Sequence, residues 1–86
     1  MHAMDDKRPE RIIVEIFGDS YPLRTDEPAR LQQLASIVDQ TMKDTARTIN
    51  SFDGRKIAVF SALKLADAYD KLKKDYEKLV ALLNEK

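Results

Sequence analysis

Apolar residues in the last third of the chain recur at alternating spacings of four and three. The series consists of Ala58, Ala62, Leu65, Tyr69, Leu72, Tyr76, Leu79 and Leu83. This is an unbroken a/d seam, the spacing of a helix that pairs with another helix. It predicts one long helix from about residue 54 to residue 84, with a narrow apolar stripe that needs a partner.

The N-terminal part of the chain predicts a β-hairpin. Residues 11–17 are rich in β-branched side chains with apolar residues on both faces, so we expect this strand to be covered on both sides. Residues 20–24 return as a second strand, which Pro22 marks as an edge strand or a bulged one. Between them, Gly18-Asp19 suits a type II′ turn, because glycine accepts the positive φ of the first loop position.

An amphipathic helix is predicted over residues 27–49, where apolar residues follow helical spacing on one face. Thr25 or Asp26 is the expected N-cap, and Pro28 fits the first helical turn.

The break in periodicity at residues 50–54 predicts the connection between the two helices. Ser51 or Asp53 is the expected N-cap of the long helix, and Phe52 is expected to pack into the core. Residues 57–63 are apolar on nearly all sides, so the hairpin, the first helix and a partner should surround them.

These elements predict an α+β fold: an N-terminal β-hairpin, an amphipathic helix and one long C-terminal helix that forms an intermolecular coiled coil. We expect three segments: a flexible arm over residues 1–10, a globular head over 11–63 and a coiled-coil arm over 64–86. The seam itself fits a parallel two-stranded coil and an antiparallel four-helix arrangement equally well.

Composition narrows the possible functions. A chain of 86 residues alone buries only roughly 60–65% of its unfolded surface, less than a larger domain does, so it is marginally stable and oligomerisation is a common remedy. Fifteen basic and fifteen acidic residues balance, which argues against binding to nucleic acid or to anionic membranes. No apolar run is long enough to span a membrane, so we expect a cytoplasmic protein.

Residues that could support catalysis are scarce. The chain has no cysteine and two glycines, which excludes thiolate metal sites and a glycine-rich phosphate loop. His2 is the only histidine, and it lies in the N-terminal arm. Glu15 is a lone acid in an apolar strand, where an outward-facing residue is far commoner than a general acid. We therefore predict no enzymatic activity, no cofactor and no metal.

Basic residues are the candidates for binding a partner. If the two helices form an antiparallel hairpin, Arg47, Arg55 and Lys56 meet at the connection, and Arg11, Arg24 and Arg30 add positive charge near the β-hairpin. Such charges either dock an acidic partner or simply keep the surface soluble.

Three blocks of sequence resemble the ZapA family of bacterial cell-division proteins. They read I-I-V-E-I-F-G-x-x-Y-x-L-R over residues 12–24, L-A-S-I-V-D-Q-T-M-K over 34–43 and R-K-I-A-V-F-S-A-L-K-L-A-D over 55–67. The resemblance implies a non-enzymatic protein that binds and cross-links protofilaments of FtsZ, a tubulin-like GTPase, and stabilises the division ring at midcell. It also implies a homodimer through the long helix, which longer members extend to an antiparallel tetramer.

The resemblance adds Phe60 to the expected oligomer interface, beside the eight seam residues. The expected partner-binding residues are Arg24, Arg30, Arg47, Arg55 and Lys56. The arm is shorter than in the longer members, so the dimer is the firmer expectation and the tetramer the open one. The alternative is a generic coiled-coil oligomerisation module for another cytoplasmic protein.

Overall fold

The computed structural model describes residues 8–85, so most of the predicted N-terminal arm, His2 included, lies outside the described residues. Four elements follow one another: β1 (Glu10–Ile16), β2 (Asp19–Thr25), α1 (Pro28–Ile49) and α2 (Gly54–Leu83). The predicted hairpin, first helix and long second helix are therefore confirmed.

The two strands form an antiparallel hairpin whose register differs from the predicted turn. Ile16 lies opposite Asp19, so the two loop residues are Phe17 and Gly18. Both have positive φ, 50° and 86° respectively. This combination belongs to a type I′ turn, and the predicted type II′ turn over Gly18-Asp19 is wrong. The register places Pro22 opposite Ile13 in a non-hydrogen-bonded pair. At such a position a backbone N–H would point away from β1, so the missing N–H of proline removes no hydrogen bond between the strands.

Helix α1 begins without a side-chain cap. Its N-cap residue is Glu27, which makes no capping bond, so the prediction that Thr25 or Asp26 caps the helix is wrong. The Thr25 hydroxyl instead accepts a hydrogen bond of 2.8 Å from the Glu27 N–H. Pro28 occupies the first turn as predicted, where its missing N–H costs nothing.

The connection between the helices confirms one expectation and overturns another. The Asp53 carboxylate caps α2 by accepting bonds from the N–H groups of Arg55 and Lys56, at 3.1 and 3.4 Å. Phe52, however, is fully exposed, so the expected packing of its ring into the core is wrong.

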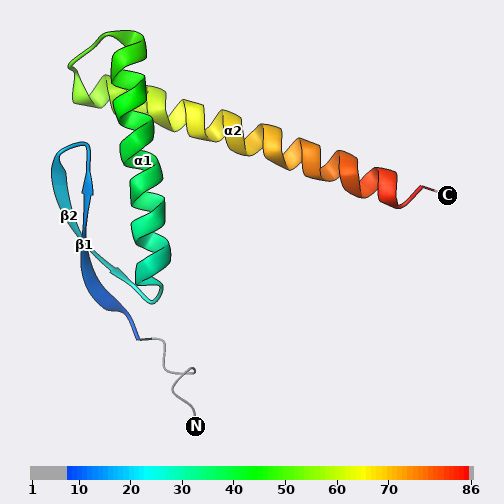
Figure 1. Cartoon of the computed structure of the whole chain (residues 1–86), viewed down its shortest axis with the longest axis horizontal. Helices are drawn as coiled ribbons and strands as arrows, with labels where there is room; N and C mark the ends of the chain where they lie inside the picture. The colour runs from blue at the N-terminus through cyan, green and yellow to red at the C-terminus, as the bar shows by residue number, and fades with distance from the viewer. Residues whose placement is uncertain (1–7, 86) are drawn as a thin grey trace.

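The elements are arranged as a flat, L-shaped molecule (Figure 1), with extents of 53 × 47 × 13 Å. The hairpin lies along α1, and α2 crosses α1 near its C-terminal end and then projects away from it. Within residues 8–85 the two helices diverge after a short contact (Figure 1), so they do not form the antiparallel hairpin on which a joint patch of Arg47, Arg55 and Lys56 depended.

The buried core is correspondingly small. Its apolar members among the described residues are Val14 from β1, Ala35 from α1 and Ile57 from α2. The hairpin is covered on one face only, since Ile13 on the other face is 64% exposed. The full cover expected for the first strand is therefore not met within a single chain, whereas the cover expected for residues 57–63, which includes a partner, stays a prediction.

Candidate interaction surfaces

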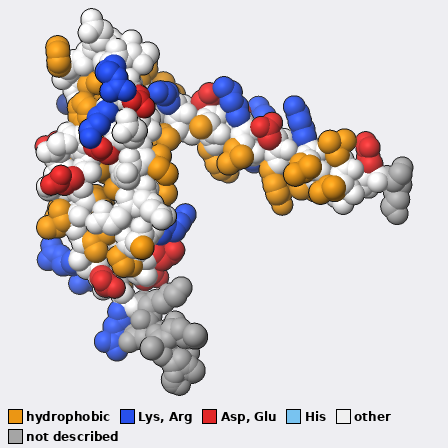
Figure 2. All heavy atoms as spheres, viewed as in Figure 1, with side chains coloured by type: hydrophobic (Ala, Val, Ile, Leu, Met, Phe, Trp, Pro, Cys, Tyr) orange, Lys and Arg blue, Asp and Glu red, His pale blue; other side chains and the backbone are white. Residues whose placement is uncertain are grey.

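The predicted seam of α2 is an uncovered apolar stripe. Tyr69, Leu72 and Tyr76 are each about two-thirds exposed, and of the eight seam residues only Leu65 is partly buried. The space-filling view shows hydrophobic side chains in a row along the lower edge of α2 (Figure 2). Regularly spaced large apolar side chains in water mark an interaction surface, because a folded protein rarely leaves such a patch bare.

Charged side chains on α2 support the helix away from this stripe. Lys71 pairs with Asp67 and Lys74 pairs with Asp70, each at 3.0 Å and each one turn apart. Because both pairs are exposed, each stabilises the helix by only about 0.3–0.5 kcal/mol. They stabilise the part of α2 that projects beyond its crossing with α1 (Figure 1).

Phe60 lies away from the seam, although we expected it in the oligomer interface. It follows Ala58 by two residues, which places it about 200° around the helix. There it lines a recess of about 340 Å³ with Thr45 and Ile49 of α1 and Leu63 of α2. Its part in dimer packing stays a prediction, and its position shows a second apolar face on the N-terminal half of α2.

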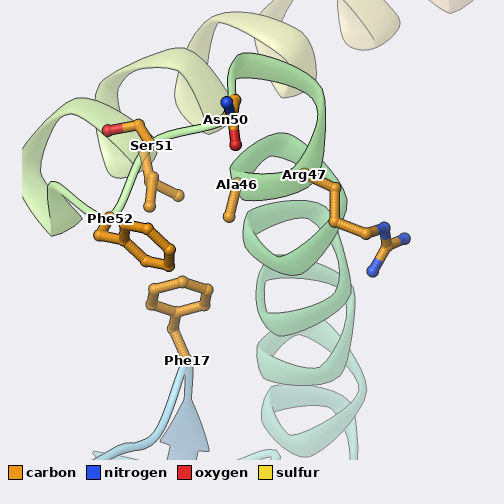
Figure 3. Close-up of a pocket in the computed structure, with 7 residues that line it drawn as sticks. Phe17, Ala46, Arg47, Asn50, Ser51 and Phe52 are labelled. Atoms are coloured by element: carbon orange, nitrogen blue, oxygen red, sulfur yellow. The ribbon is translucent and has the colours of Figure 1, made fainter.

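The candidate basic residues are spread over the head. Arg24 lies directly opposite Arg11 on the exposed face of the hairpin, and Arg30 is exposed in the first turn of α1. The Arg47 guanidinium is paired with the Asp44 carboxylate on its own helix. Figure 3 shows Arg47 pointing away from the connection that precedes α2.

Arg55 and Lys56 are exposed in the first turn of α2, where their backbone N–H groups bind the Asp53 cap. A single patch of Arg47, Arg55 and Lys56 required antiparallel helices, and the crossing helices do not provide that arrangement (Figure 1). The partner-binding role of all five basic candidates remains a prediction.

A second recess of about 340 Å³ lies at the tip of the head, between the hairpin turn, the end of α1 and the connection. The rings of Phe17 and Phe52 lie close to each other across it, with Ala46 beside them (Figure 3). Ile57 forms part of its lining. Two aromatic rings from segments 35 residues apart in sequence therefore share one open apolar surface.

Asp39 fixes the position of Phe17 at this tip. The Phe17 N–H donates a hydrogen bond of 2.7 Å to the Asp39 carboxylate, and Lys43 makes an ion pair of 2.9 Å with the same side chain. The bond from Lys43, and then the bond from the Phe17 N–H, hold the pKa of Asp39 below its usual value. Asp39 lies 22 residues after Phe17, and no local signal in the sequence indicated that it would hold the hairpin turn.

Residues 8–85 contain neither a candidate metal site nor a candidate membrane span. No cluster of three or more metal-binding side chains occurs there, and neither helix is apolar enough over a sufficient length to cross a membrane.

Comparison with known proteins places these surfaces in context. The family model described as cell division protein ZapA matches residues 12–86. A relative named cell division protein ZapA from Geobacillus thermodenitrificans (strain NG80-2) is 35% identical over 81 residues, covering 93% of this chain and 89% of the relative. Another, from Bacillus pumilus (strain SAFR-032), is 37% identical over 84 residues, covering 96% and 99%.

A solved structure described as a ZapA mutant dimer from Geobacillus stearothermophilus is similar over the whole fold. Its TM-score is 0.70 at 30% sequence identity, and the match covers 99% of this chain and 100% of that chain. Head and long helix are thus both shared with a protein that was solved as a dimer, which supports self-association.

Proposed function

We propose that this chain, which belongs to the ZapA family of cell division proteins, is a non-enzymatic adaptor that binds and cross-links FtsZ protofilaments. It acts in the cytoplasm at the midcell division site, where cross-linking stabilises the division ring during septation. FtsZ enters this proposal through the family resemblance. The support from the structure is an uncovered apolar stripe on α2, through which two copies of the chain would join their heads.

The observation that carries the proposal is the uncovered stripe on α2. Residues 69–83 lie beyond the contact with α1, so the stripe cannot be covered by its own head. A second copy of the chain covers such a stripe and joins two heads in one particle. Homodimerisation is therefore the core of the proposal, and pairing of two dimers to a tetramer is its extension.

Joining two heads explains how weak contacts become effective. A dimer bound by one head presents its second head at a high local concentration, which can raise avidity 10²- to 10⁴-fold over that of a single head. The basic candidates on the head, Arg24, Arg30, Arg47, Arg55 and Lys56, are proposed contacts to the filament.

Co-sedimentation with FtsZ polymers tests the proposal. The wild-type chain at micromolar concentration should pellet with polymers and increase light scattering by bundling them. The variant Leu72→Asp places a charge in the stripe and should yield monomers that no longer bundle filaments. Absence of both pelleting and scattering with the wild-type chain would refute the adaptor function and favour an oligomerisation module for another protein.

A further inference from the structure

The recess at the tip of the head is an apolar surface that the single chain leaves uncovered. Phe52 has a relative exposure of 102%, and its ring faces the half-buried ring of Phe17 across the recess (Figure 3). Ala46 and the buried Ile57 add to the apolar lining. A fully exposed ring forgoes the stabilisation that burial gives, and apolar side chains grouped at a recess are typical of a binding site.

The backbone holds Phe17 at the tip against its conformational preference. Phe17 has a φ of 50° at the first loop position of the type I′ turn, where asparagine, aspartate and glycine are favoured. Its N–H donates a bond of 2.7 Å to the Asp39 carboxylate, which is itself paired with Lys43. Strained residues that are held by their surroundings cluster at functional sites. A bulky ring at this turn position therefore indicates a use for the ring.

The size of the recess limits what can occupy it. Its volume of about 340 Å³ lies near the lower end of the range of ligand pockets, roughly 300–1,000 Å³. It accepts one or two side chains. The face of a folded protein needs far more surface, because a stable interface buries about 800 Å² on each partner. The occupant is therefore a protruding segment with a large apolar side chain.

Positive charge borders the recess on the side of the connection. Arg55 and Lys56 are exposed in the first turn of α2 and make no ion pair within residues 8–85. The Asp53 carboxylate accepts bonds from their backbone N–H groups. Arg47 also lines the recess, but its guanidinium is paired with Asp44. Two unpaired cations beside an apolar recess fit a segment that carries carboxylates next to its apolar side chain.

The recess stays accessible when the α2 stripe is covered. It lies on the hairpin side of α1, whereas α2 projects beyond α1 on the opposite side (Figure 1). The molecule is only 13 Å thick along its shortest axis, the direction of this view, so the two surfaces are well separated. Each chain of a dimer therefore carries one open recess.

We propose that the tip recess of each head binds a protruding segment of the filament subunit. The segment inserts a large apolar side chain between Phe17 and Phe52 and places carboxylates beside Arg55 and Lys56. This inference rests on the proposed function and specifies the contact by which a head holds a filament. The apolar side chain supplies most of the affinity, because it removes two aromatic rings from water, and the carboxylates orient the segment.

Substitution of Phe52 tests the inference, with Ile13 of the hairpin as the matched control. Both side chains are large, apolar and exposed, so neither substitution removes much packing from the head. In co-sedimentation with FtsZ polymers, Phe52→Ser should weaken binding by about tenfold or more, as the loss of an aromatic anchor does. Phe52→Leu should retain most of the binding, and Ile13→Ser should bind like the wild-type chain. Unchanged binding of Phe52→Ser, or an equal loss with Ile13→Ser, would overturn the inference.

Reversal of the two cations tests the carboxylates of the segment. The double variant Arg55→Glu/Lys56→Glu leaves the apolar lining in place, and acidic residues in the first turn favour the helix. It should bind the polymers several-fold more weakly than the wild-type chain at low salt, and the difference should shrink as ionic strength rises. Binding as tight as that of the wild-type chain at low salt would refute an acidic segment.

Analytical ultracentrifugation separates the inference from its alternatives. Phe52→Ser should have the same mass in solution as the wild-type chain. A smaller mass would show that the recess holds a second copy of this chain, and would overturn the proposal. If the wild-type chain itself does not pellet with polymers, the proposed function fails and the inference falls with it. If wild-type and Phe52→Ser chains pellet equally, the function stands and the tip recess is not the contact.

Discussion

At the scale of single residues, the hairpin turn is the most constrained part of the head. Phe17 and Gly18 both adopt left-handed backbone conformations, and for a bulky residue such as Phe17 this is unusual. The Asp39 carboxylate holds the Phe17 N–H, and the ring of Phe17 lines the recess at the head tip. A strained turn is thus fixed from outside the hairpin, by a side chain of α1.

Gly18→Ala isolates the backbone requirement of the turn. A Cβ at this position would meet no atom within 4 Å, so the cost comes from φ +86° alone. We expect a loss of about 1–2 kcal/mol in the free energy of unfolding, measured by urea titration at constant protein concentration. Gly54→Ala is the control, because that glycine has open space and no positive φ. It should be neutral or stabilising by up to ~1 kcal/mol. Equal effects of both variants would contradict the explanation.

Asp39→Asn tests the tether through its pH dependence. The pKa of Asp39 is lowered in the folded chain, first by Lys43 and then by the Phe17 N–H. The unfolded state therefore binds more protons at low pH, and the stabilisation is present above about pH 4 and lost as pH falls toward the folded pKa. The variant should melt at a lower temperature at pH 7 and lose less stability on acidification. Parallel melting curves against pH for the two proteins would show that the carboxylate is not involved.

At the scale of elements, the crossing of α1 and α2 decides the shape of the head. Thr45 and Ser61 are both buried there, and within the described residues neither side-chain hydroxyl has a hydrogen-bond partner. Small side chains at a crossing let two helices approach closely at one point and diverge elsewhere. The elements therefore form a corner instead of a helical hairpin, which leaves the α2 stripe open.

Thr45→Val should stabilise the crossing, because it replaces an unpartnered buried hydroxyl with a methyl group of similar size. We expect a gain of about 1 kcal/mol in the free energy of unfolding. Thr48→Val is the matched control on the same helix, since Thr48 is exposed and its hydroxyl binds the Asp44 carbonyl. Its effect should stay within about ±0.5 kcal/mol. A destabilised Thr45→Val variant would indicate that this hydroxyl finds a partner in the folded protein.

At the scale of the whole molecule, the apolar surface left exposed far exceeds the buried core. Three buried apolar residues among those described cannot support an independent globule, whereas the α2 stripe offers a large surface to a second chain. Folding and self-association should therefore be coupled.

This coupling predicts a melting temperature that depends on protein concentration. Association with a second folded chain stabilises the folded state by mass action, so the melting temperature should rise when concentration increases from about 1 to 100 μM. Circular dichroism at 222 nm provides the measurement. Leu72→Asp should remove most of the dependence, and a wild-type melting temperature that is constant over this range would show that the single chain folds alone.

The amino-acid sequence by itself determined the elements of this protein and their order. Apolar spacing, Asp53 and Pro28 act through neighbours within one or two turns, so local physical chemistry is sufficient to place both helices and both strands. The resemblance of the three sequence blocks to one family had the same basis in order and spacing, and the family match confirmed it.

Only the tertiary structure decided how these elements meet. The type I′ turn and the exposure of Phe52 differ from what local patterns favoured, and local patterns did not indicate the corner between the helices (Figure 1). Each depends on contacts between distant residues, such as the bond from Phe17 to Asp39, which spans 22 positions. Periodicity shows which face of a helix is apolar, but the direction in which that face points is set by the side chains that bury one another at the crossing.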